Sequence, residues 1–487
     1  MIKQVLLVVV AFIVAGCFFQ EAQAQILDDT TKNVYGPKST RFVLESDVAK
    51  GLDTLYLIDT SLTNIHLMEE YTWKPNRILQ NLGNIGTATQ PLYFELPTQI
   101  GRRLGIDIFT PYAYNNGEIH YLNTYSPTTY AQYLQGGNGR QILKAGFSQN
   151  VNSRLNVGFD IKSITSHKQI GNPVAEERET SHNSVLFFTS FVSKDTLYRV
   201  LANYAFMNHG LAETGGVQPT ANDTTNTKSL IKSNLFDFEQ ERGRLSTNSQ
   251  SREFRYAFRL YQEYNLKKLG LVVFHRYIYH RQKNSFSDPD AQNSSLYSYR
   301  QTTNPNLDTG IVLFTDELKF QENEHTLGIR RNWRWFAGSF WAKTRTFDYV
   351  SNFNNYKGSY RTETWLGGNI ELSPFKNATL NTTANYILGK DYELRSVLKI
   401  GKFGAGIELL NWSATLQQLD YRNAYLNWQN DFKNQSAQHL FAFLNLGKDK
   451  ASITFKGNLQ TLQNLVYFSA DATPKQSSDL TSVLSIE

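Results

Sequence analysis

The feature that most constrains this chain is a two-residue alternation of apolar and polar side chains that recurs from about residue 129 onward. In segment 451–459, apolar or small side chains fall at every second position and polar ones lie between them. Segments 155–162, 254–261, 378–388 and 393–400 repeat the pattern. Successive side chains of a strand point to opposite faces. The pattern therefore predicts strands with one apolar and one polar face.

The length of the repeating region predicts how the strands are assembled. It accommodates about sixteen strands, with a range of about 14–18. So wide an open sheet would expose its edges, whereas a barrel closes them. After the first 20 residues, no apolar run approaches the roughly 18 needed for a membrane-spanning helix. We predict an all-β fold, a transmembrane antiparallel up-and-down β-barrel over 129–487. A soluble secreted β-sandwich remains a rival.

Connection lengths support an up-and-down order. Short turns are predicted near 150–153, 194–195, 267–268, 322–324, 374–376, 402–404 and 448–450, and long polar connections near 166–181, 209–250, 282–307, 351–357 and 413–433. Short periplasmic turns and longer extracellular loops alternate in such barrels. One long strand over 326–349 preserves the alternation, whereas a hairpin near 332–334 breaks it. Six aromatic residues are predicted to form an interfacial girdle: Tyr264, Tyr277, Tyr279, Phe347, Tyr349 and Tyr386.

The amino terminus predicts export. A basic start at Lys3, an apolar run and an A-x-A site at 22–24 predict a signal peptide over 1–24. A second interpretation is a lipobox at 14–17, in which Cys17 is lipidated. Cys17 is the only cysteine, so cleavage after Ala24 leaves none in the mature chain.

Two regions depart from the alternation. Residues 25–128 are punctuated by Gly and Pro and are too irregular for membrane strands. We predict an N-terminal periplasmic or plug-like segment there. The last residues, 484–487, stop within a strand pattern and without a terminal aromatic. The barrel is therefore either truncated at this end or has an atypical last strand.

The sequence offers no basis for catalysis, cofactors or nucleic-acid binding. The nine histidines form no H-x-x-x-H pair, and His275 and His280 fall on opposite faces of one strand. No G-x-S-x-G motif occurs, and Gly136, Gly137 and Gly139 fit a hairpin turn rather than a phosphate loop. Lysine and arginine are scattered, with a net charge of +6. We expect no enzyme activity, no metal, no cofactor and no nucleic-acid partner.

Charged residues in mid-strand on the polar faces are the functional signal. By alternation, the pore-lining candidates are Asp160, Lys162, Arg255, Arg259, Glu263, Glu317, Lys319, Arg330, Lys343, Arg345, Glu393, Arg395, Lys399, Glu408 and Lys456. Charges on lipid-facing positions cost about 2–4 kcal/mol at the bilayer midplane. They should therefore face a lumen. They either line a weakly selective aqueous pore or pair across strands in a filled lumen.

Several motifs carry a resemblance to a known family. They are YGPK at 35–38, TRF at 40–42, DTLYLIDT at 53–60, NLGNIGTA at 81–88, PYAY at 111–114, QGG at 135–137, GR at 139–140, NVGFD at 156–160 and KQIG at 168–171. In these the chain resembles the putative-porin family of Bacteroidetes outer membranes. The resemblance covers about the first 170 residues. It implies a porin-like barrel and carries no catalytic residues.

The expected function is passive diffusion of small hydrophilic solutes through an outer-membrane channel. The alternative is a non-conducting structural or surface-interaction barrel whose long loops bind a partner or polysaccharide. Expected partners are outer-membrane lipid, the outer-membrane insertion machinery and small hydrophilic solutes. A homo-oligomer is left open.

Overall fold

The computed structural model describes residues 39–52, 54–58, 73–74, 77–115, 117–169, 177–216, 245, 248–289, 314–351, 361–423, 426–448 and 451–487. All of them belong to one compact unit, Pro37–Glu487. The predicted signal peptide, Cys17 and the motif at 35–38 lie outside the described residues, as do parts of all five predicted long connections.

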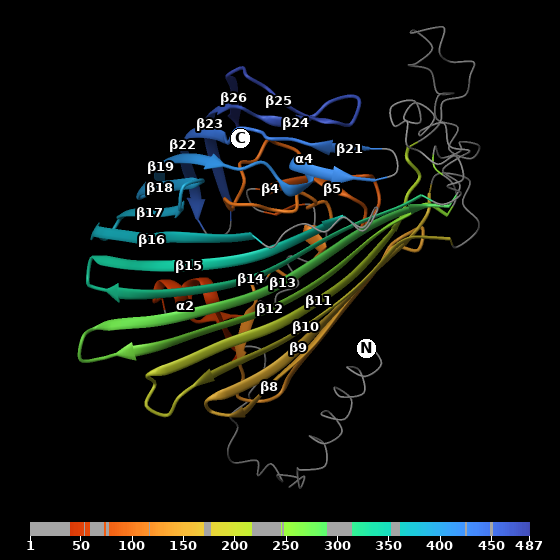
Figure 1. Ribbon diagram of the computed structural model, residues 1–487. Coiled ribbons are helices and arrows are strands. Elements are labelled where there is room, and N and C mark those ends of the chain that lie inside the picture. Colours follow the sequence, from red (N-terminus) through yellow and green to blue (C-terminus); the bar gives the residue numbers. More distant parts are fainter. Residues whose placement is uncertain are drawn as a thin grey trace, which may run out of the picture. The chain divides into compact units, whose positions relative to one another are not determined.

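Sixteen strands form one antiparallel sheet whose neighbours follow the order of the chain (Figure 1). They are β7 (Thr128–Gln135), β8 (Gln141–Asn152), β9 (Leu155–His167), β10 (Arg178–Val192), β11 (Tyr198–Ala212), β12 (Gln250–Leu266), β13 (Leu271–Asp288), β14 (Phe314–Asn332), β15 (Phe336–Ser351), β16 (Arg361–Phe375), β17 (Ala378–Ile387), β18 (Tyr392–Ile400), β19 (Phe403–Trp412), β22 (Gln435–Lys448), β23 (Ala451–Gln463) and β26 (Thr481–Ile486). The predicted fold class and strand number are confirmed. Strands β7 and β26 end the order, and no ladder between them occurs among the described residues.

Small elements precede the sheet and occupy two of its connections. Before it come β1 (Arg41–Leu44), α2 (Glu45–Lys50), β2 (Tyr56–Leu57), β3 (Trp73–Lys74), β4 (Arg77–Asn81), β5 (Thr89–Pro91), the 3-10 helix η2 (Thr110–Tyr112) and β6 (His120–Asn123). The connections hold α4 (Leu416–Leu419), β20 (Asp420–Arg422), β21 (Asn427–Gln429), β24 (Val466–Phe468) and β25 (Pro474–Gln476). Within the described residues, no helix is long and apolar enough to cross a membrane.

The turns correct one part of the sequence interpretation. The turn predicted at 322–324 is wrong, because these residues lie in the middle of β14, which pairs with β13 and β15 throughout. The hairpin near 332–334 exists, and the long strand over 326–349 does not. Around β14 the alternation of short and long connections still holds, because β14 begins as early as Phe314. The β7–β8 and β17–β18 connections are exceptions, because they are short as well. The hairpin predicted at the glycines 136–139 is confirmed by the bond from Gly136 N to Arg140 O, 2.8 Å.

The two faces of the sheet differ as the alternation requires. On β9, Val157, Phe159 and Ile161 are 37–39% exposed, whereas Lys162 on the other face is only 8% exposed. We call the face of Lys162 the inner face and the other the outer face. Apolar side chains on the outer face suit contact with lipid acyl chains.

The inner face is shaped in several places by a phenylalanine that lies over a glycine of the next strand. A Cβ added at Gly158 would lie 2.3 Å from the ring of Phe188, and one at Gly406 would lie 2.3 Å from the ring of Phe441. The missing side chain lets the ring lie flat on the neighbouring backbone. Such pairs fix the register between strands.

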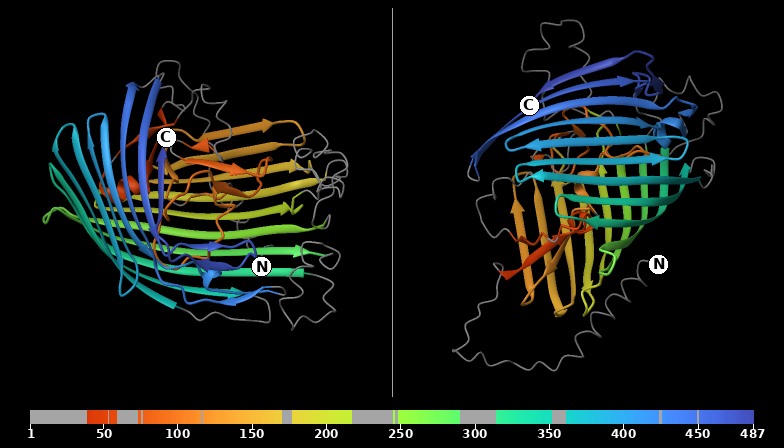
Figure 2. Two further views of the ribbon diagram at one scale, coloured as in Figure 1. Left: turned by 90° about the horizontal axis from the view of Figure 1, so that it is seen from above. Right: turned by 90° about the vertical axis from the view of Figure 1, so that its left-hand side faces the viewer.

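The sheet curves around the N-terminal elements. Figure 2 shows the red and orange segments, which include α2 and β4–β6, on the concave side of the long green and yellow strands. We call the described part of residues 40–123 the N-terminal segment. Its position on the inner face determines what the predicted pore-lining charges do.

Candidate functional site

Helix α2 of the N-terminal segment is held by charged side chains of the inner face. Glu45 accepts two hydrogen bonds from Arg259 of β12, at 2.5 Å from Nε and 2.7 Å from Nη2. The side chains of Arg259 and Glu45 are 14% and 2% exposed. Arg330 of β14 donates to the carbonyl of Val48, and Asn332 donates to Gly51 O at 3.0 Å. The end of the helix is therefore capped by the barrel wall, which satisfies carbonyls left without intrahelical partners.

An apolar cluster lies beside these bonds. Val48 of α2 and Tyr121 of β6 are buried against Leu186, Phe188 and other inner-face residues of β10–β13. The amide of Asn203 donates to the phenol oxygen of Tyr121 at 2.7 Å. Burial raises the pKa of Tyr121 above its ordinary value, so the phenol stays neutral. The hydrophobic contacts and the ion pairs together fix this part of the segment to the wall.

The stretch from Pro97 to Ile106 crosses to strands further along the sheet. The backbone N–H of Gly101 donates to Asp391 at 2.9 Å, and that of Arg102 donates to Glu363 at 3.3 Å. Arg345 donates to the carbonyl of Arg102. Burial lowers the pKa of the Arg102 guanidinium below its ordinary value. This stretch is therefore bonded to the sheet mainly through its backbone.

Two histidines meet the N-terminal segment near η2. His182 and His209 approach at 3.1 Å between their Nδ1 atoms, and both are fully buried. The ring of Tyr112 stacks on His209 with centroids 5.3 Å apart. The phenol of Tyr112 donates to Thr87 O at 2.8 Å. The histidine pair thus forms part of the floor on which η2 packs.

The inner face therefore consists of two contrasting regions. On β8–β16, which we call the packed wall, the side chains of Arg345, Glu363 and Glu253 are 2% exposed or less. On β17–β19, β22, β23 and β26, which we call the polar wall, Arg395 is 26% exposed and Lys456 29%. Lys399 is exposed as well. Water reaches Arg395, Lys399 and Lys456, whereas Glu393 and His439 on the same wall are 8% and 10% exposed. Most charged pairs of the packed wall are more deeply buried than Arg395 and Lys456, although Arg276 there is 26% exposed.

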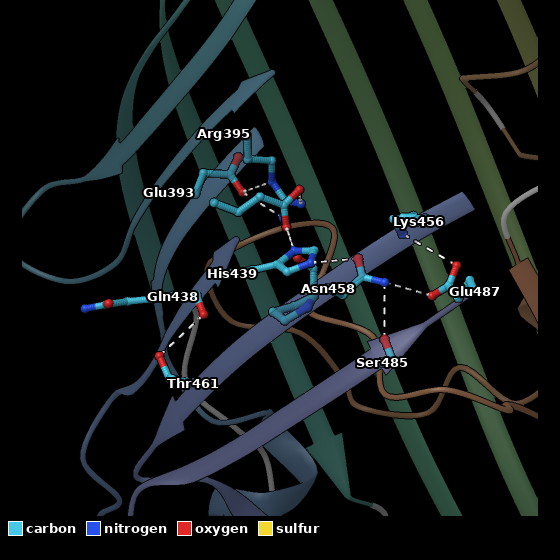
Figure 3. Close-up of polar contacts among 11 residues, drawn as sticks. Glu393, Arg395, Gln438, His439, Lys456, Asn458, Thr461, Ser485 and Glu487 are labelled. Carbon is cyan, nitrogen blue, oxygen red and sulfur yellow. Dashed lines mark hydrogen bonds and ion pairs between the residues drawn. The ribbon is translucent and has the colours of Figure 1, made fainter. Parts of the chain in front are cut away.

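A continuous line of polar contacts crosses the polar wall (Figure 3). Arg395 pairs with Glu408 at 3.3 Å, and Glu408 accepts from His439 at 3.0 Å. His439 bonds Asn458 at 3.1 Å. Asn458 donates to Glu487 at 3.1 Å, and Lys456 lies 3.7 Å from the same carboxylate. Charges of both signs face the same side, as a weakly selective aqueous wall requires.

Thirteen of the fifteen predicted pore-lining residues lie on the inner face. They are Asp160, Lys162, Arg255, Arg259, Glu263, Arg330, Lys343, Arg345, Glu393, Arg395, Lys399, Glu408 and Lys456. Several of them bind the N-terminal segment rather than open water. Beyond Arg259, Arg330 and Arg345, Arg255 donates to Thr110 at 2.9 Å and Arg395 donates to Pro97 O at 2.6 Å.

Glu317 and Lys319 are a correction, because they lie on the outer face. Lys283 and Lys319 both pair with Glu317 there. Near this end of β14 the apolar residues Leu318 and Phe320 turn inward and pack with Leu104. Apolar side chains therefore do not always lie on the outer face. Where the N-terminal segment packs against the inner face, they point inward instead.

The same inversion corrects the aromatic girdle. Phe347 is 1% exposed and Tyr349 5%. Both belong to the inward cluster with Leu416 and Tyr421. The outer-face residues Tyr264 and Tyr386 are each 44% exposed, as girdle residues should be.

Several acidic partners of these arginines are not among the residues predicted from the sequence. Glu45 was not singled out, because the N-terminal segment has no periodicity to place it. Glu363 and Glu253 occupy buried inner-face positions of β16 and β12, and extending the same alternation along these strands predicts them. Asp391 lies in a short turn, and only the structure shows its four bonds.

Nothing in the described part of the chain resembles a metal centre. No group of three or more His, Cys, Asp or Glu among those residues could hold a metal ion.

Comparison with known proteins gives one family and several distant folds. The family described as "Putative porin" matches residues 40–487. No curated protein matches the chain. Among solved structures, the siderophore receptor PirA from Acinetobacter baumannii is 11% identical with a TM-score of 0.45, covering 74% of this chain and 57% of that one. PirA from Pseudomonas aeruginosa is 9% identical with a TM-score of 0.47, covering 76% and 65%. The ferric-catecholate import receptor Fiu from K12 E. coli is 10% identical with a TM-score of 0.46, covering 74% of this chain and 61% of that one. The chain thus spans less than two thirds of the length of these receptors, and similarity at this level transfers no ligand.

Proposed function

This chain belongs to the putative-porin family, and from that premise we propose that it lets small hydrophilic solutes diffuse across the outer membrane along the polar wall. Membership of this family supports a transport role for an outer-membrane barrel. The proposal adds the path that the solutes take and the kind of solute that passes. It includes no catalytic step.

The observation that carries the proposal is the contrast between the two walls. The N-terminal segment covers the packed wall, whose charged side chains are 0–15% exposed in most pairs. The polar wall keeps Arg395, Lys456 and Glu487 at 26–32% exposure. A solute that follows the polar wall remains in contact with water and with charges of both signs. This arrangement favours small polar solutes with little preference for either sign of charge.

Conductance of the full chain in a planar bilayer tests the proposal. Discrete open-channel steps are expected. Lys399→Glu replaces a cation of the polar wall by an anion, so the reversal potential in a salt gradient should shift toward cation selectivity. Lys319→Glu makes the same change on the outer face and is the matched control, for which no shift is expected. Equal shifts for both variants would contradict a route along the polar wall.

A second function is favoured by the N-terminal segment itself. Leu96 and Ile100 pack in one cluster with Ala437, Leu462 and Val483, so the segment also reaches the far end of the polar wall. This contact favours a barrel whose inside is blocked by the N-terminal segment. Such a barrel conducts no solutes and acts through interactions at its surface. Folded protein that shows no conductance in any bilayer would support this function and overturn the first.

A further inference from the structure

An apolar groove of about 370 Å³ lies on the outer face of β14–β17. Two adjacent rows of cross-strand neighbours form it. The first row is Ile329, Phe340, Gly368 and Ala384, and the second is Arg331, Gly338, Ile370 and Thr382. The groove is therefore built into the register of four strands rather than into one loop.

Small residues make the floor of the groove, and large apolar residues make its walls. Gly368 contributes no side chain, and the ring of Phe336 covers Gly338, 2.7 Å from where a Cβ would lie. Phe340 is 55% exposed, and Ile329 and Ile370 are each 47% exposed. The hydroxyl groups of Thr382 and Ser396 bond each other at 2.8 Å. One hydroxyl donates to the other, so the bond satisfies one donor and one acceptor of the pair without water.

One end of the groove bears a positive charge and indole rings. Arg331 lines the groove and its guanidinium lies 5.4 Å from the centre of the Trp333 ring. Trp333 and Trp335, in the short β14–β15 turn, are 66% and 55% exposed. Tryptophan and arginine of this kind gather at the level of lipid headgroups. Short turns face the periplasm in such barrels, so the groove runs from the periplasmic headgroup level toward the bilayer centre.

We propose that this groove binds one glycerophospholipid of the periplasmic leaflet, with an acyl chain between Phe340 and Ile370 and the phosphate on Arg331. The exposed apolar side chains of the outer face suit contact with lipid, and the groove is continuous with that face. A guanidinium binds a phosphate through charge-assisted hydrogen bonds. A flexible acyl chain can follow the apolar rows that line the groove.

Native mass spectrometry of the full chain, released from detergent and titrated with dioleoyl phosphatidylglycerol, tests the site. The dissociation constant of the first bound lipid should be about tenfold lower than those of later ones. Ala384→Phe places a ring in the groove and should weaken the first binding about tenfold. Arg331→Gln should weaken it by a similar factor, because the charge on the phosphate loses its partner.

Two control variants make the result decisive. Ala442→Phe adds the same ring to an exposed outer-face position of β22, and Lys402→Gln removes a cation from another short turn. Neither should change the first binding more than about twofold. An unchanged first binding in Ala384→Phe, or an equal loss in Ala442→Phe, would overturn the site. The same titration is made with lipid A. If lipid A binds the parent protein and Ala384→Phe abolishes that binding, the assignment of the groove to a phospholipid is overturned.

Discussion

Glu45 and Arg259 lie 214 residues apart in the sequence and form a two-bond ion pair that joins the N-terminal segment to the barrel wall. A charge pair removed from water is costly to break, because each partner is left buried and unpaired. The two charges therefore neutralise each other inside the barrel and do not line a water-filled pore.

Reversing one charge of this pair should loosen helix α2. Arg259→Glu sets two carboxylates against each other and should cost about 3–5 kcal/mol of docking free energy. Hydrogen exchange of residues 45–50 measures the loss as faster exchange of their amides. The double variant Glu45→Arg/Arg259→Glu should recover much of the protection. Lys475→Gln, whose ion pair is largely exposed, should leave it unchanged.

Removing the Asp391 carboxylate should release the stretch around Gly101. Asp391 accepts from the backbone N–H groups of Gly101 and Ser413, both at 2.9 Å. Each buried donor left unpaired in Asp391→Ala should cost about 1–3 kcal/mol. Limited proteolysis should then cut near residue 100 faster than in the parent. Asp479→Ala, at an exposed site, serves as control, and equal cleavage in both variants would contradict the role of Asp391.

The two walls should differ in access to a water-soluble thiol reagent. Thr326 on the packed wall is 0% exposed, whereas Thr383 lies half-buried on the polar wall. In a Cys17→Ser background, Thr383→Cys should react with a methanethiosulfonate cation at least about tenfold faster than Thr326→Cys. The substitution is the same at both positions, so only the surroundings differ. Similar rates would mean that the N-terminal segment leaves the packed wall open.

Filling a glycine under an aromatic ring should destabilise the barrel. The Cβ of Gly158→Ala would lie 2.3 Å from Phe188 and 2.9 Å from the carbonyl of Phe147. The ring and backbone must shift, at a cost of about 1–3 kcal/mol. Guanidinium unfolding followed by tryptophan fluorescence measures this loss. Gly457→Ala is the control, because nothing lies within 4 Å of its Cβ.

The period of two was sufficient to predict the strands, their number and most of their faces. It placed Arg259 inside correctly, because its neighbours Phe258 and Leu260 are apolar and lie on the outer face. Arg345 also lies inside as predicted, although its neighbours Thr344 and Thr346 are polar. It failed at Glu317 and Phe347. There the inside of the barrel is filled, so the apolar side chains pack inward and the charges face outward.

The sequence by itself determined the sheet, because alternation is a local property that each strand carries in its own residues. The tertiary structure alone decided what the inward charges contact. Arg259, Arg345 and Asp391 each bond a residue in a segment without periodicity, 214–290 residues away. Contacts over such separations depend on how the segment folds back into the barrel, and no local pattern records that path.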